Sequence, residues 1–211
     1  MNTADLLAFT RGLLSDDGVG QFLIADNIIY EYLADAQFTF ALDTRCFISQ
    51  LTIPTVIDQA SYALPNNTLR VYETLVDGVS YPYMNRSIQQ FDPLPVIPDT
   101  CHRYYRTDLL TKQLTLNPVP TSVVDIHINY LRGPAARISA LVDPEIDEEY
   151  HTALAHYAVA QCEHIFDSEL NIPRFAKAHI AIWQARLRQA VLHYRRLHEG
   201  SPVRFTHRQA W

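Results

Sequence analysis

Residues 143–164 read DPEIDEEYHTALAHYAVAQCEH and raise the question of whether their charged side chains form an active site or begin a helix. Five of the first seven residues carry carboxylates. Asp143 suits a helix N-cap, Pro144 suits the first helical position, and acidic residues in the first turns complement the helix dipole. Alanines follow at positions that allow close packing between helices. The stretch therefore predicts a helix that begins at Asp143, in which the acidic cluster has a structural role.

Three histidines in the same stretch raise the alternative of a metal site, but His151, His156 and His164 are five and eight residues apart. Two metal ligands on one helix are normally four residues apart, so these side chains point to different faces. Glu145 and Glu149 lie one helical turn apart and could form an acid–base pair, yet a solvated first turn lacks the burial that tunes a pKa. We therefore expect no enzyme, no cofactor and no metal site, with a carboxylate-dependent hydrolase kept as an alternative.

Helical spacing predicts three further helices outside this stretch. One covers residues 3–14 behind a Thr3 cap, another covers residues 26–44, and the last runs from about Pro173 to Glu199. The last helix contains an apolar stripe of Ile180, Trp183, Leu187, Val191 and Tyr194. Most of its arginines lie off that stripe, at positions 186, 188, 195 and 196. It is therefore expected to be a basic amphipathic helix.

Between these helices, residues 46–132 change to a period of two, which is typical of strands. The segment CFISQLTIP begins this region, and TLRVYETLV leads into Asp77-Gly78, a pair that suits a type I′ hairpin turn. The segments QLTLNPVP and VVDIHINYL are expected to pair with each other. The segment FDPLPVIPDT contains three prolines, which predicts a loop or a sheet edge.

The order of these elements predicts an α+β fold, namely an α-helical bundle of about four helices with an antiparallel β insertion and an extended C-terminal tail. The expected helical ring-forming unit consists of residues 1–45 and 140–199. The β insertion is expected at residues 46–135, and a C-terminal docking tail at residues 200–211.

The composition narrows the class of protein further. No apolar run approaches the roughly 18 residues of a membrane span, and the first residues lack the pattern of a signal peptide, so we expect no membrane partner. Cys46, Cys101 and Cys162 are odd in number and widely spaced, which argues against a disulfide framework. Phosphate-binding glycine loops, G-x-S-x-G and H-E-x-x-H are all absent from the sequence. The common enzyme chemistries therefore have no motif here.

Charge is distributed unevenly along the chain. Residues 174–211 contain eight Lys and Arg against one acid, a net charge of +7. The chain totals are 17 basic and 23 acidic residues, so residues 1–173 hold 9 and 22 of these, a net charge of −13. This pattern indicates either a solvated helix face or two surfaces that meet different partners.

The order of the elements also resembles the head-to-tail adaptor (connector, or head completion) proteins of tailed bacteriophages. The resemblance rests on two N-terminal helices, the Y-x-L-P step at residues 62–65, an aromatic-rich strand before LTLNPVP, the helix start P-E-I-x-E-E-Y-H-x-A-L and the long basic helix. It covers nearly the whole chain. Its specificity comes from the order of the parts, because none is a catalytic fingerprint.

The resemblance implies a non-enzymatic structural protein of the virion, made in the host bacterial cytoplasm and placed in the neck between head and tail. Its expected partners are the portal protein, tail or nozzle proteins, and further copies of itself in a ring of about twelve subunits. Genomic DNA would pass through the channel without specific binding. The net charge of −13 on residues 1–173 fits that passage, because basic contacts to phosphates would add affinity for DNA.

The segment SPVRFTHRQAW, residues 201–211, adds a candidate docking site. Arginine and tryptophan often anchor interfaces, so we expect portal docking through the last helix and this tail. The residues of this hypothesis are Arg195, Arg196, Arg204, Phe205, Arg208 and Trp211. Two alternatives stay open, a frayed terminus and a nucleic-acid-binding protein that uses the basic C-terminal helix.

Overall fold

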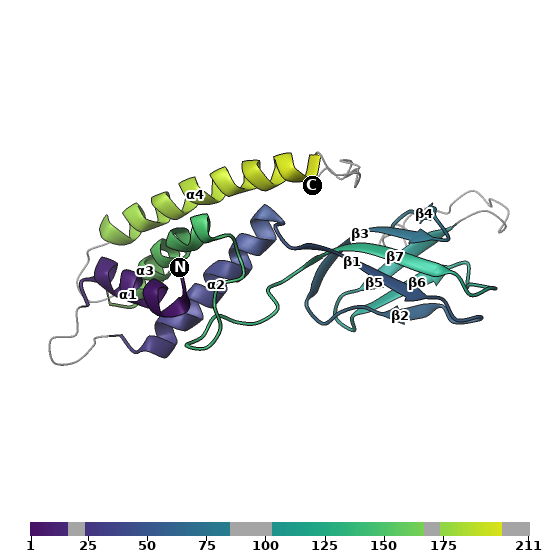
Figure 1. The fold of residues 1–211 in the computed structure, drawn as a ribbon, viewed down its shortest axis with the longest axis horizontal. Coiled ribbons are helices and arrows are strands. Elements are labelled where there is room, and N and C mark those ends of the chain that lie inside the picture. Colours follow the sequence, from purple (N-terminus) through teal and green to yellow (C-terminus); the bar gives the residue numbers. More distant parts are fainter. Residues whose placement is uncertain (17–23, 85–102, 167–173, 200–211) are drawn as a thin grey trace, which may run out of the picture. The chain divides into compact units, whose positions relative to one another are not determined.

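The computed structural model describes residues 1–16, 24–84, 103–166 and 174–199 (Figure 1). The chain divides into two compact units. One consists of Met1–Cys46 with Pro134–Trp211, and the other consists of Phe47–Gly133. All the helices described belong to the first unit, hereafter the helical unit, and all the strands described belong to the second, the β unit.

The helical unit is built around α3, which packs against each of the other helices described (Figure 1). Its elements are α1 (Thr3–Leu14), α2 (Asp26–Thr44), a short 3-10 turn η2 (Glu148–Tyr150), α3 (His151–Phe166) and α4 (Arg174–Glu199). The predicted bounds of α1, α2 and α4 are confirmed to within one residue. Apolar spacing was a sufficient signal for these helices, because each buries side chains at helical intervals in the unit's core.

The start of α3 differs from the prediction, because the helix begins at His151 rather than at Asp143. The Asp143 carboxylate accepts hydrogen bonds from the backbone N–H of Thr3 at 2.7 Å and from its hydroxyl at 2.6 Å. Thr3 is the first residue of α1, whose own N-cap is Asn2. Asp143 therefore caps a helix 140 residues away in sequence, not the helix that follows it.

Aromatic side chains form the centre of the helical unit. Phe40 of α2 is fully buried, and its ring centroid lies 5.2 Å from that of Tyr150 and 6.1 Å from that of Trp183 on α4. Tyr157 of α3 contacts the same tryptophan at 5.2 Å. Such tilted aromatic pairs add to the energy of area burial, so this cluster joins three helices into one core.

A buried ion-pair network joins the end of α1 to the start of α2. The Arg11 guanidinium donates to the Asp16 carboxylate at 2.6 Å, to the carbonyl oxygen of Ile24 at 2.9 Å, and to the Asp26 carboxylate. Arg11 is buried although it lies on a short amphipathic helix. Nothing in the local pattern predicts this, because its partners come from the chain beyond the helix.

The described residues of the β unit form seven strands, all paired antiparallel, in two sheets (Figure 1). The strands are β1 (Ile48–Pro54), β2 (Ser61–Ala63), β3 (Thr68–Val76), β4 (Val79–Tyr81), β5 (Tyr104–Asp108), β6 (Gln113–Asn117) and β7 (Asp125–Arg132). One sheet has the order β1-β7-β3-β4, and the other has the order β2-β6-β5. Side chains from both sheets share one apolar core, which includes Tyr62, Tyr105, Leu114 and Ile128.

Two local predictions for this unit have different outcomes. The Asp77-Gly78 turn is confirmed, since both residues have positive φ and the turn joins β3 to β4. The expected pairing of residues 113–120 with 123–131 is wrong, because β6 pairs with β2 and β5 whereas β7 pairs with β1 and β3. β7 is a central strand with β1 paired along one edge and β3 along the other, and the local sequence pattern does not indicate these partners.

The predicted architecture, an α-helical bundle with a β insertion, is wrong. The described residues form four α-helices and seven antiparallel strands in two sheets, a mixed α+β fold that the expected class matches only loosely. The strands are a unit with their own core rather than an appendage of a bundle. Strand periodicity does not reveal how strands divide between sheets, which is why the error arose. The proline-rich segment 91–100 and the tail 200–211 lie outside the described residues.

Candidate docking surface on helix α4

Helix α4 presents a basic surface on the side that does not pack against the helical unit. Trp183 and Tyr194 of the predicted apolar stripe are buried, and the other three stripe residues are half-buried. Ala176 and Ala190 are also buried, although alanine gives too weak a signal to identify this from sequence. The exposed residues described in α4 include five with Lys or Arg side chains, namely Lys177, Arg186, Arg188, Arg195 and Arg196.

Apolar side chains interrupt this basic face near the end of the helix. Leu192 is 54% exposed and Leu197 is 56% exposed. Both lie off the predicted stripe, and leucines off the stripe of a strongly basic helix were the sequence signal that could have identified them. Arg196 and His198 lie in the last turn, where positive charge complements the helix dipole.

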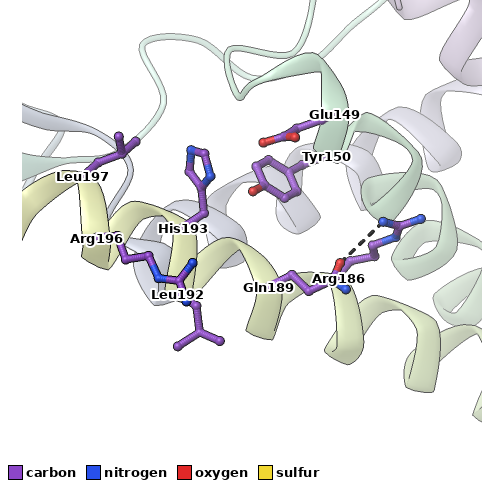
Figure 2. Close-up of a pocket in the computed structure, with 8 residues that line it drawn as sticks. All are labelled: Glu149, Tyr150, Arg186, Gln189, Leu192, His193, Arg196 and Leu197. Carbon is purple, nitrogen blue, oxygen red and sulfur yellow. Dashed lines mark hydrogen bonds between the residues drawn. The ribbon is translucent and has the colours of Figure 1, made fainter.

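A hollow of about 500 Å³ opens on this surface (Figure 2). Its lining comes from α4 and from the η2 turn, and consists of Glu149, Tyr150, Arg186, Gln189, Leu192, His193, Arg196 and Leu197. Figure 2 shows Glu149 and Tyr150 facing His193 of α4. We call Arg186, Arg195, Arg196, Leu192 and Leu197 the α4 docking surface. It combines exposed guanidinium groups with exposed aliphatic groups beside a concave site.

One side of the hollow is acidic and hydrogen-bonded. The Tyr194 hydroxyl donates to the Asp147 carboxylate at 2.6 Å. Burial, followed by this hydrogen bond, raises the pKa of Tyr194, and burial followed by the neighbouring Glu149 raises the pKa of Tyr150 to about 12. Both phenols therefore stay protonated near neutral pH, so neither acts as a base there.

Within the described residues, one cluster of side chains could coordinate a cation, and it lies beside the hollow. Ligand atoms of Asp147, Glu149 and His193 all fall within 4.8 Å of one another. All three side chains are exposed, and Asp147 is already engaged by Tyr194. Exposed acidic groups of this kind are common on solvated surfaces. These three side chains are not buried, so water competes with them for a cation and the group does not mark a metal site.

The sequence matches the family model described as SU10 adaptor protein over residues 1–206. The chain belongs to this family of phage head-tail adaptors. No curated protein matches the chain. Membership makes the chain a structural protein of a bacteriophage virion that takes part in virion assembly. Proteins of this family interact with other head and tail components. None of the helices in the described ranges combines the length and hydropathy that a membrane span needs.

Glu145 and Glu149, the pair of the catalytic interpretation, have different surroundings in the adaptor. The backbone N–H of Glu145 donates to the side-chain carbonyl of Gln37 at 2.7 Å, and its carboxylate accepts from the N–H of Ala135 at 2.7 Å. Glu145 thus fixes the chain before η2, while Glu149 faces the hollow on α4. Engagement in local structure, together with membership of a structural family, favours a non-enzymatic role.

The histidines of the quoted stretch also lie in different environments. His151 is buried, with each ring nitrogen 2.9 Å from a backbone carbonyl oxygen, one of Met1 and one of Ile146. His156 instead pairs with His179 of α4, their Nδ1 atoms 2.8 Å apart. Both arrangements are contacts between separate segments of the helical unit.

The predicted docking residues of the adaptor are described only in part. Arg195 and Arg196 are exposed near the end of α4, and Arg196 lines the hollow. The remaining predicted residues, Arg204, Phe205, Arg208 and Trp211, lie outside the described residues. Sequence reasoning missed Leu192, Gln189 and His193, which share the same surface as Arg196.

Proposed function

We propose that this adaptor forms a ring in the phage neck, beneath the portal, and directs the α4 docking surface at the portal protein. The observation that carries the proposal is the combination on α4 of exposed arginines, exposed leucines and a hollow of about 500 Å³. A solvated helix face needs charge but not exposed leucines beside a hollow. Arginine is among the residues that most often anchor interfaces, and exposed leucines beside a hollow add apolar area that a partner can bury.

In this proposal the C-terminal residues continue the same interface. Arg204, Phe205, Arg208 and Trp211 would add guanidinium groups and aromatic rings to those of α4, with Phe205 and Trp211 filling pockets between neighbouring portal subunits. Segments that order on binding lose entropy at that moment, so their contribution depends on large buried anchors. Tryptophan and phenylalanine are side chains of that kind.

The ring itself and the passage of DNA are further parts of the proposal. Homo-oligomers close by rotational symmetry, and the resemblance implies about twelve subunits around a channel. The net charge of −13 on residues 1–173 supports free passage, because an acidic surface does not exchange counterions with phosphates. The free chain is expected to be mostly monomeric at low concentration, because parts that assemble on a template should not close prematurely.

Negative-stain imaging of the purified chain mixed with portal rings of its phage tests the proposal. We expect an added ring at one end of the portal. A portal that remains bare at saturating concentrations of the adaptor would contradict it.

The basic face of α4 also favours a second candidate function, binding of nucleic acid through the phosphates. Arg186 and Arg188 are exposed, and α4 has no acidic residue between Arg174 and Leu197. The overall charge of −6 and the exposed leucines argue against nucleic-acid binding, because phosphates favour a basic and polar surface. A mobility shift of duplex DNA by the isolated chain that weakens steeply with salt would favour this function over portal docking.

A further inference from the structure

Five exposed aliphatic side chains meet at one end of the β unit, on three different turns. Val56 and Ile57 follow β1 and are 52% and 53% exposed, and Val79, the first residue of β4 after the Asp77-Gly78 turn, is 40% exposed. Val119 and Val123 precede β7 and are 40% and 66% exposed. We call these five residues the apolar tip. Isolated surface valines need no explanation, but a cluster drawn from separate turns indicates an interaction site.

Backbone hydrogen bonds bring the three turns together. The N–H of Thr55 donates to the carbonyl of Val124 at 2.7 Å, and the N–H of Asp58 donates to the carbonyl of Pro120 at 3.0 Å. The N–H of Asp77 donates to the carbonyl of Asp125 at 3.1 Å, which joins the β3–β4 turn to the same end. The three segments are therefore held next to one another at the same end of the β unit.

Side-chain hydrogen bonds hold the tip in place. The Thr55 hydroxyl is buried, donates to the carbonyl of Ser122 at 2.8 Å and accepts from the N–H of Val124 at 2.7 Å. The Tyr62 hydroxyl donates to the carbonyl of Gln59 at 2.9 Å and accepts from the N–H of Val56 at 3.2 Å. A preordered surface loses little conformational entropy on binding, which suits a docking role.

The described segments that form the tip carry charge of one sign. Asp58, Asp77 and Asp125 are exposed there, and segments 55–59, 76–80 and 118–125 contain no Lys, Arg or His. No ion pair to these three carboxylates is found within the described part of the chain. An acidic rim repels phosphates, so nucleic acid and anionic lipid surfaces do not fit this surface. A protein with lysines and arginines around an apolar groove does fit it.

We infer that the apolar tip is a docking surface for a tail-side virion protein that presents a basic rim around an apolar groove. The inference rests on the proposed function, in which the opposite-signed α4 docking surface meets the portal. Complementary charge steers and orients the partner, and burial of the five aliphatic groups supplies the affinity. The adaptor then has two chemically distinct surfaces, one for each side of the neck.

The test uses phage that lack a functional copy of this gene, with adaptor variants supplied from a plasmid. Ile57→Ser with Val123→Ser should leave the amount of adaptor on purified heads unchanged and lower the fraction of tailed particles by at least about tenfold. The matched control is Leu110→Ser, which removes a side chain 96% exposed in the β5–β6 turn, outside the tip. The control should form tailed particles normally.

Charge reversal identifies the partner. Asp58→Lys with Asp125→Lys should block tail attachment, and suppressor mutations should replace Lys or Arg by Glu or Asp in one tail-side protein. Suppressors in α4 of the adaptor itself would show that a second copy occupies the tip and would overturn the inference. Normal tailing of the tip variants, or loss of these variants from heads, would overturn it as well. The proposed function is tested separately by Arg195→Glu with Arg196→Glu, which should remove the adaptor from heads.

Discussion

Asp143 illustrates at the scale of single residues how tertiary contacts reassign a predicted role. Its carboxylate binds both the N–H and the hydroxyl of Thr3, and these hydrogen bonds hold the pKa of Asp143 below its usual value. It satisfies a backbone donor that the first turn of α1 cannot satisfy internally. The residue therefore attaches α1 to the segment that precedes α3.

Replacement of Asp143 by alanine should lower the stability of the helical unit, because Thr3 at the start of α1 loses the acceptor of two hydrogen bonds. Asp143→Asn keeps an acceptor oxygen for Thr3 and should retain most of the stability. The control is Asp43→Ala, since Asp43 is exposed near the end of α2. Urea unfolding followed by far-UV circular dichroism measures the difference. Equal midpoints for Asp143→Ala and Asp43→Ala would contradict the capping role.

The His156–His179 pair predicts a dependence of stability on pH. Burial, the neighbouring His179 and the Arg186 charge lower the pKa of His156, and burial lowers the pKa of His179. The unfolded chain therefore takes up protons at a higher pH than the folded chain, so stability is lost as the pH falls below about 6.5. The Nδ1–Nδ1 hydrogen bond adds to this, because two charged rings cannot form it.

The melting temperature should thus drop more between about pH 7 and pH 5 for the wild type than for His156→Gln with His179→Gln. Phe9 of α1 packs edge-on against His156. The single variant His156→Gln therefore shows how much of the drop in melting temperature comes from the loss of this packing. Identical pH profiles for the wild type and the double variant would show that other groups carry the dependence.

At the scale of elements, α4 divides into a buried stripe and a basic face whose end carries the docking surface. Trp183 and Tyr194 attach the helix to the core, and the hydroxyl of Tyr194 reaches Asp147 before η2. His198 adds a contact near the end of the helix, 3.3 Å from the carbonyl oxygen of Arg45. The described part of α4 is thus attached to the helical unit at several points along its length.

Deletion of residues 201–211 should therefore leave the melting temperature of the free protein nearly unchanged while strongly weakening attachment to portal rings. The physical reason is that anchors such as Trp211 and Phe205 contribute to an interface only when a partner buries them. Co-sedimentation with purified portal measures the attachment. If the truncated chain co-sediments as well as the full chain, the tail is not part of the interface.

At the scale of the whole molecule, the β unit leaves and rejoins the helical unit at neighbouring points. The N–H of Arg132 donates to the carbonyl of Phe47 at 3.0 Å, so the two ends of the unit lie side by side. The unit has its own apolar core between two sheets. Segments with adjacent ends and a separate core are typical of independently folding domains.

Residues 47–133 should therefore fold when expressed alone. We expect a strand-rich circular dichroism spectrum and a cooperative unfolding transition, because the buried tyrosines and aliphatic side chains of the core are all supplied from within the segment. The control is the same segment with Ile128→Asp, which places a charge in the core and should prevent folding. A disordered spectrum for the unsubstituted segment would contradict the prediction.

The sequence alone determined the elements whose signals are local. The bounds of α1, α2 and α4 follow from helical periodicity, and the β3–β4 hairpin follows from Asp77-Gly78 and its tolerance of positive φ. The order of the elements determined the resemblance to phage adaptors, and the match over residues 1–206 confirmed it. The basic residues of α4 were also apparent, because charge is read directly from composition.

The tertiary structure decided whatever depends on partners distant in the chain. Such contacts decide which helix Asp143 caps, and they divide β6 and β7 between two sheets. They also explain the burial of Arg11. The hollow on α4 combines that helix with η2, and the apolar tip combines three turns. Periodicity describes which side of one element is buried, but it carries no information on which other element covers that side.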